Sequence, residues 1–114
     1  METRKLVYIY VAGPISHGDY GVNIRNGVEA ATRLLEHGFI PYCPHLSAFH
    51  HIIFPQPYER WIELDFAWLE KCDALLRLDG YSPGADREID HARARGIPVF
   101  NSLDTVLAVA HAIL

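Results

Sequence analysis

The stretch that decides the fold is residues 6–12, LVYIYVA, which is followed at once by Gly13-Pro14. Its residues are β-branched or aromatic almost throughout. That composition is typical of a central parallel strand buried on both faces. A short apolar run that ends in Gly-Pro therefore predicts the first strand of an α/β sheet.

Helical and strand-like segments alternate after this run. Residues 20–37 carry one apolar stripe, and Gly38 is placed to end the helix; the stripe consists of Ile24, Val28, Ala31 and Leu35. Strands are predicted at residues 39–42, 74–78 and 97–100, with helices at 58–71 and 85–95, and a last helix capped by Ser102 or Asp104 that runs toward Leu114. Residues 43–57 are rich in Pro and His without a period, which predicts a long loop.

Strands separated by helices indicate βαβ units with right-handed crossovers. We expect a single domain over residues 1–114. Its fold should be α/β, a three-layer, doubly wound parallel sheet of four or five strands of the Rossmann or flavodoxin type. In such sheets the ligand lies outside the carboxyl ends of the strands.

Charge and composition limit the function classes. The net charge of −4 argues against sequence-independent binding of nucleic acid, so a small-molecule partner is favoured. No apolar run approaches the roughly 20 residues that span a bilayer, so no membrane partner is expected. With only two cysteines, Cys43 and Cys72, a reducing cytoplasm is the expected location. A lone subunit of 114 residues has a high surface-to-volume ratio, which favours a homo-oligomer.

The end of the first strand is the first candidate site. Small residues there let a ligand approach the backbone, so substrate contacts are predicted at Gly13, Pro14, Ile15 and Ser16. The alternative is that Gly13-Pro14 only turns the chain. Tyr10, near the strand's end, is placed to orient an acid with its hydroxyl, or else it packs in the core.

The segment DGYSPGADRE, residues 79–88, is the second candidate site. Ser82 and the amides of Gly84 and Ala85 are placed to hold a phosphate or carboxylate at a positive helix end. Glu88 lies about one turn further on, facing the crevice or the sheet. The commoner role of an acid at this place is to complement the helix dipole.

Asp65 is the third candidate, because it lies inside an aromatic stripe four residues after Trp61 and three before Trp68. A carboxylate so placed is partnered or has a raised pKa, and it is either catalytic or a structural acid that bonds a neighbouring loop. Breaking an N-glycosidic bond creates positive charge on the sugar, so one carboxylate can attack the anomeric carbon while a second assists the departing base. Glu88 and Asp65 are the predicted pair.

Histidine is abundant in residues 43–57. His45, His50 and His51 fit no standard ligand spacing, so no metal and no cofactor are predicted. His45 is predicted to contact the base or the sugar, or else to form a hydrogen bond within its loop.

Three motifs in order, YVAGP, ELDFAWLEKCD and SPGADREIDHARARGIPV, resemble the nucleoside 2-deoxyribosyltransferase superfamily. The similarity covers most of the chain. The short length and Ser82, six residues before Glu88, are similar to the 2′-deoxynucleoside 5′-monophosphate N-glycosidases within it. These hydrolases place an Arg shortly after the first-strand Gly, where this chain has Ser16 followed by His17.

The resemblance implies that Glu88 is the nucleophile, Tyr10 its orienting partner, and Asp65 a contact to the sugar hydroxyl or an aid to base departure. It also implies a homodimer or a larger homo-oligomer. The leading hypothesis is hydrolysis of the base–sugar bond of a (deoxy)nucleoside 5′-monophosphate through a glycosyl intermediate on Glu88. The alternatives are base exchange by a nucleoside deoxyribosyltransferase and a non-catalytic nucleotide-binding module.

Overall fold

A computed structural model describes residues 5–114, which form a four-stranded, all-parallel sheet in the order β2-β1-β3-β4. The strands are β1 (Tyr8–Ala12), β2 (Ile40–Tyr42), β3 (Ala74–Arg77) and β4 (Val99–Phe100). β1 pairs with both β2 and β3, with Tyr10 beside Tyr42 and Leu75. The central parallel strand and the predicted α/β fold class are thereby confirmed, with four strands.

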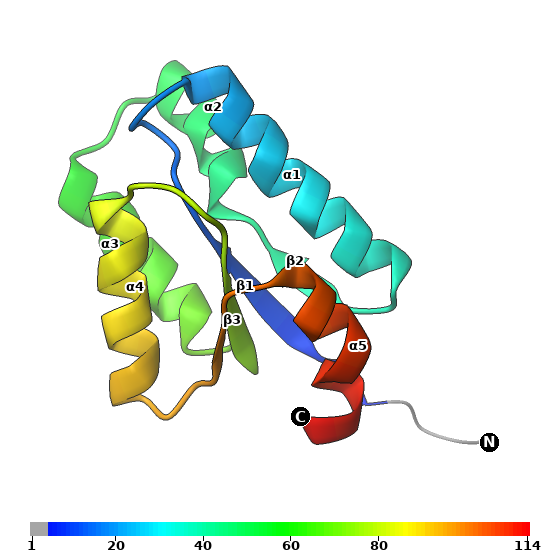
Figure 1. The fold of residues 1–114 in the computed structure, drawn as a ribbon. Helices are drawn as coiled ribbons and strands as arrows, with labels where there is room; N and C mark the ends of the chain where they lie inside the picture. The colour runs from blue at the N-terminus through cyan, green and yellow to red at the C-terminus, as the bar shows by residue number, and fades with distance from the viewer. Residues whose placement is uncertain (1–4) are drawn as a thin grey trace.

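Helices cover both faces of the sheet (Figure 1). One face carries α1 (Tyr20–Glu36) and α5 (Leu103–Ile113), and the other carries α3 (Tyr58–Leu69) and α4 (Pro83–Ala94). Alternate residues of β1 pack against the two helical layers. Ile9 and Val11 pack toward Leu34 and Val106, whereas Tyr10 and Ala12 pack toward Leu69 and Ala85. The Tyr10 side chain therefore lies on the face of the sheet that α3 and α4 cover.

Helix ends follow the local sequence. Ser82 caps α4, since its Oγ accepts a hydrogen bond from the Ala85 amide at 3.1 Å. Pro83 then occupies the first turn, where its missing N–H is no loss, so α4 begins two residues before the predicted start at Ala85. Ser102 caps α5 in the same way, accepting from the Thr105 amide at 3.3 Å.

The prediction of an irregular loop over residues 43–57 is wrong in part. This stretch contains the 3-10 turn η1 (Pro44–Leu46) and the helix α2 (Ser47–Ile53). A seven-residue helix is barely two turns long, so it hardly develops an apolar period. Its apolar residues Phe49, Ile52 and Ile53 are also exposed, which removes the usual contrast between an inner and an outer face.

No helix within residues 5–114 is long and apolar enough to cross a membrane.

Gly27, in the middle of α1, lies directly against the buried ring of His45. A Cβ at this position would stand 2.4 Å from His45 Cγ. We therefore expect Gly27→Ala to destabilise the fold by about 1–3 kcal/mol, because overpacking outweighs the better helix propensity of Ala. Urea denaturation measures this, with Gly21→Ala in the exposed first turn as the control that should cost little. Equal stability of the two variants would contradict the close packing of His45.

Candidate active site

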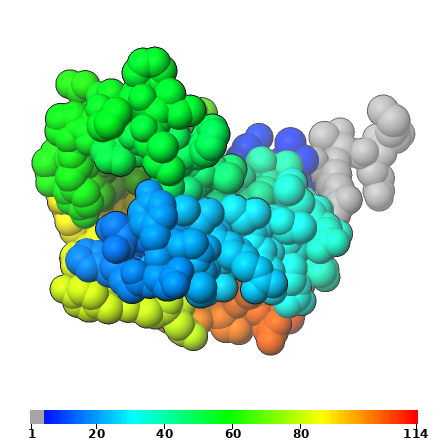
Figure 2. Space-filling model, turned by 90° about the horizontal axis from the view of Figure 1, so that it is seen from above, coloured from blue at the N-terminus to red at the C-terminus, as the bar shows by residue number. Residues whose placement is uncertain are grey.

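A cavity of about 350 Å³ opens at the carboxyl end of the sheet. Figure 2 looks onto this end, where the green, blue and yellow segments meet around a hollow. Its lining comes from the β1–α1 loop, η1, α2, α3 and the start of α4. This is the edge at which doubly wound sheets bind ligands. Of the predicted site residues, those that line it are Gly13, Ile15, Ser16, Asp65, Ser82, Gly84 and Glu88.

Glu88 lines this cavity, and Tyr10, which does not line it, lies buried in contact with Glu88. The Tyr10 hydroxyl donates a short hydrogen bond to Glu88 Oε2, and both side chains are buried. Burial, together with the neighbouring Glu88 carboxylate, raises the pKa of Tyr10 well above its ordinary value, so the phenol keeps its proton and stays a donor. The structure thus joins two residues 78 positions apart in one contact.

Asp65 comes to the same place from α3. It is buried, its carboxylate adjoins Glu88 and the Tyr10 hydroxyl, and its Oδ1 has no hydrogen-bond partner among the described residues. Burial raises the pKa of both Asp65 and Glu88 above the ordinary range. Ionising both carboxyls would bring two negative charges together, so we expect the pair to hold one shared proton over part of the pH range.

Arg77, at the end of β3, acts against the rise in the pKa of Glu88. Its positive charge lowers the pKa of Glu88, against the larger rise caused by burial. Arg77 is held by the Leu78 carbonyl, by the Gly80 carbonyl at 2.9 Å and by Asp86 Oδ1 at 3.2 Å. It therefore fixes the β3–α4 turn and stabilises the anionic form of Glu88.

Folding stability should depend on pH through the carboxyl pair. The folded pKa values exceed the unfolded ones, so the folded state keeps protons that the unfolded state releases, and stability falls as pH rises from about pH 5 to about pH 8. One unit of pKa shift corresponds to about 1.4 kcal/mol. We expect wild type to lose more than this amount relative to Glu88→Gln over that interval, as measured by urea denaturation at both ends. Parallel pH curves for the two proteins would contradict a raised pKa for Glu88.

The start of α4 offers fewer free donors than the sequence indicates. The Ala85 amide, predicted to bind an anion, is occupied by Ser82 Oγ. Ser82 retains its own O–H for a ligand, and Gly84 lines the cavity beside the Tyr58 hydroxyl, which would stand 3.0 Å from a Cβ at Gly84. Within residues 5–114, none of the lining residues is Lys or Arg.

Pro14 and His45 do not line the main cavity. Both line a second, smaller cavity, together with residues of α1 and the end of β3. His45 is almost fully buried, and its Nδ1 lies 3.5 Å from Cys43 Sγ. Its ring fills the space that Gly27 leaves open, which agrees with the alternative of a histidine bonded within its own loop.

The lining also contains residues that the sequence analysis did not predict as site residues, among them Tyr20, His51, Gln56, Trp61 and Ile62. Trp61 and Asp65 are four residues apart, so they share a face of α3. That spacing was a usable signal for Trp61. No signal existed for His51 and Gln56, because their place depends on how α2 and the following turn fold back toward α3.

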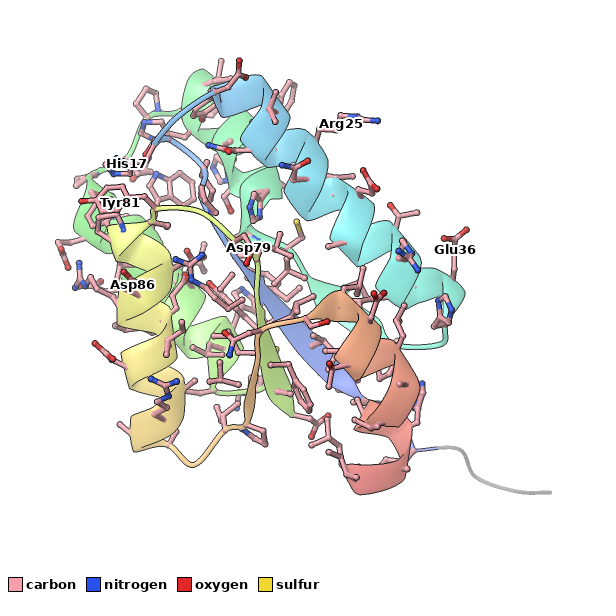
Figure 3. The ribbon with its side chains drawn as sticks, viewed as in Figure 1. His17, Arg25, Glu36, Asp79, Tyr81 and Asp86 are labelled. Atoms are coloured by element: carbon pink, nitrogen blue, oxygen red, sulfur yellow. The ribbon has the colours of Figure 1, made fainter. Side chains whose placement is uncertain are left out.

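The mouth of the cavity brings together two loops. His17 of the β1–α1 loop and Tyr81 of the β3–α4 loop lie side by side (Figure 3), with ring centroids 5.2 Å apart and the rings nearly perpendicular. His17 lines the cavity, whereas Tyr81 is exposed.

Comparisons with known proteins agree with this architecture. The chain is similar to a structure described as a conserved protein from Enterococcus faecalis V583, with a TM-score of 0.68 and 24% identity, over 94% of this chain and 78% of that one. It is also similar to a 2-deoxyribosyltransferase from the psychrotolerant bacterium Bacillus psychrosaccharolyticus, with a TM-score of 0.61 and 16% identity, over 82% of this chain and 69% of that one. At these identities the likeness establishes the fold.

A search of curated proteins found no match. A family model described as Domain of unknown function (DUF7768) matches residues 5–102, most of the described chain. Because this match covers most of the chain, the chain belongs to the DUF7768 family.

Proposed function

We propose that this protein cleaves the N-glycosidic bond of a nucleoside or nucleoside 5′-monophosphate, with Glu88 as the nucleophile. One observation carries the proposal: a buried carboxyl pair, Glu88 and Asp65, lines a cavity large enough for a small ligand, and the Tyr10 hydroxyl holds Glu88 from within the core. Burying a carboxyl costs stability. Buried carboxyls with raised pKa values are therefore concentrated at functional sites, where the chemistry uses them.

The proposed reaction uses both ionisation states of the pair. One Glu88 oxygen attacks the anomeric carbon while the bond from that carbon to the base nitrogen breaks, and its electron pair leaves with the base. The sugar carries positive charge in the transition state, which the carboxylate stabilises. Water then attacks the anomeric carbon, Glu88 departs as carboxylate, and the water proton goes to the base.

Tyr10 supports this chemistry by holding one oxygen of Glu88. A hydrogen bond donated to a carboxylate favours its charged form, so Tyr10 lowers the pKa that burial raises. It also restricts how the carboxylate turns. The shared proton resides on Asp65 when Glu88 is ionised, and a protonated Asp65 is then a donor for a sugar hydroxyl or for the leaving base.

Aromatic side chains in the lining of the cavity suit a base. They include Tyr20, Tyr58 and Trp61, and flat heterocycles bind well against such surfaces. The sugar would then present its anomeric carbon to Glu88. A 5′-phosphate would meet neutral donors, Ser82 and the amide of Gly84, with His17 nearby.

The test is free-base release, followed by chromatography, from ribo- and 2′-deoxyribonucleosides and their 5′-monophosphates. Base release that Glu88→Gln removes supports the proposal. Tight binding of these compounds without any turnover would overturn it in favour of a nucleotide-binding module. Comparing each nucleoside with its monophosphate measures what the phosphate adds.

Base exchange is the second candidate, favoured by the similarity to a 2-deoxyribosyltransferase. The same glycosyl intermediate would then be attacked by a second base. Adding a different free base to the reaction distinguishes the two, since a transferase forms a new nucleoside. Homo-oligomerisation and a cytoplasmic location stay predictions.

A further inference from the structure

His51 is held from one edge by two donors. Trp61 Nε1–H donates to His51 Nδ1 at 2.8 Å, and the Gln56 backbone N–H donates to the same nitrogen at 3.2 Å. A nitrogen that accepts two hydrogen bonds carries no proton. The neutral imidazole therefore has its hydrogen on Nε2, the tautomer that this network selects.

The ring's neighbours keep this edge in place. Trp61 meets the His51 ring edge to face, with centroids 5.8 Å apart, and His50 packs against Trp61 in the same manner at 5.0 Å. The Gln56 side chain is in turn bound by Arg60 at 2.6 Å. His51 is thus a preorganised group, which is the condition under which a single donor has a large effect on a reaction.

His51 also lines the main cavity. Both of its partners occupy the Nδ1 edge, so the Nε2–H is the polar group of this side chain left for a ligand. Trp61 lies one helical turn before Asp65 on the same face of α3, about 6 Å along the axis. His51 is thus bound to a residue one turn before Asp65 on the same face of α3.

We propose that His51 donates its Nε2–H to the leaving base, and that this base is a purine held along its N7 edge. The proposal rests on the proposed glycosidic cleavage. As the bond between the anomeric carbon and N9 breaks, its electron pair moves into the purine ring, and N7 gains negative charge. A hydrogen bond to N7 stabilises that charge; the proton stays on His51, and the base takes its own proton from water.

The two classes of base differ in where their acceptors lie. In a pyrimidine, O2 adjoins the anomeric carbon, close to Glu88 and Asp65, and O4 lies on the far side of the ring. In a purine, N7 is conjugated with the glycosidic nitrogen, and in guanine O6 extends the same acceptor edge. We commit to N7, and cleavage of pyrimidine nucleosides is the competing outcome.

The experiment compares two substrates in the same variants. 2′-Deoxyguanosine has a free N7, whereas 7-methyl-2′-deoxyguanosine has no acceptor there and its base departs neutral. His51→Phe should lower kcat on the first about 100-fold and on the second less than about threefold. His50→Phe, a change at the neighbouring residue that also packs on Trp61, is the matched control and should leave both rates near wild type.

Trp61→Phe tests the tautomer, since it removes one of the two donors to Nδ1. Because Trp61 also lines the cavity, the variant should lower kcat on both substrates, but the loss on 2′-deoxyguanosine should exceed the loss on the methylated substrate and stay smaller than that of His51→Phe. Equal losses on the two substrates in His51→Phe would make the role structural and overturn the proposal. Wild-type cleavage of pyrimidine nucleosides alone would also overturn it.

Binding separates this proposal from the proposed function. If wild type releases no base from any compound, the glycosidase proposal fails, and calorimetry still decides on His51. In that case 2′-deoxyinosine should bind His51→Phe about tenfold more weakly than wild type, while 7-deaza-2′-deoxyinosine binds both alike. Equal affinity of the two proteins for 2′-deoxyinosine would refute the contact.

Discussion

Glu88→Gln is expected to reduce base release by at least about 10³-fold, because an amide cannot form the glycosyl intermediate. The substitution preserves the shape of the side chain and an oxygen that can accept the Tyr10 hydrogen bond. It also removes a buried ionisable group, so the variant should fold at least as stably as wild type near pH 8. Chromatography of released base and urea denaturation measure the two effects.

Asp90→Asn is the matched control for this prediction. Asp90 lies on the same helix, two residues further on, and is exposed. Its variant should keep wild-type activity within about twofold, as surface substitutions away from a site generally do. Retention of wild-type turnover by Glu88→Gln would exclude Glu88 as nucleophile, whatever the fold of the variant.

Asp65→Asn is expected to lower kcat about 100-fold and to change the pH profile. The asparagine cannot share a proton with Glu88. It also removes a negative neighbour that raises the pKa of Glu88, so Glu88 should ionise at lower pH. The acidic limb of the pH–rate profile therefore moves to lower pH while the maximal rate falls.

The exposed residue Glu63, two positions before Asp65 on α3, supplies the control as Glu63→Gln. That variant should retain both the rate and the profile of wild type. A uniform loss of rate in Asp65→Asn, with no movement of the acidic limb, would show that the two carboxyls do not interact during the reaction.

Much of the fold could be predicted because the local signals are strong. Residues 6–12 predict the central strand by composition, and Ser82 followed by Pro83 marks the start of α4 by cap chemistry. The convergence of Tyr10, Asp65 and Glu88 was also predictable, because parallel strands and the helices after them meet at one edge of the sheet. Their catalytic roles stay predictions.

What could not be predicted depends on packing between distant segments. His45 lies in a Pro- and His-rich stretch. Its ring is buried away from the main cavity because Gly27, on helix α1, leaves room for it. The opposite holds for His51, which reaches that cavity because Trp61 and the Gln56 amide hold it. Histidines six residues apart in one segment thus have different surroundings for reasons outside that segment.

The hydrogen bond between Tyr10 and Glu88 has a consequence for folding. It joins the first strand to the fourth helix, 78 residues apart, and β1 pairs with β3 in parallel, so no local hairpin brings them together. Such distant pairings close late and slowly. The recovery of activity during refolding would therefore report when β1 and α4 dock. The recovery of helix content alone would report earlier steps.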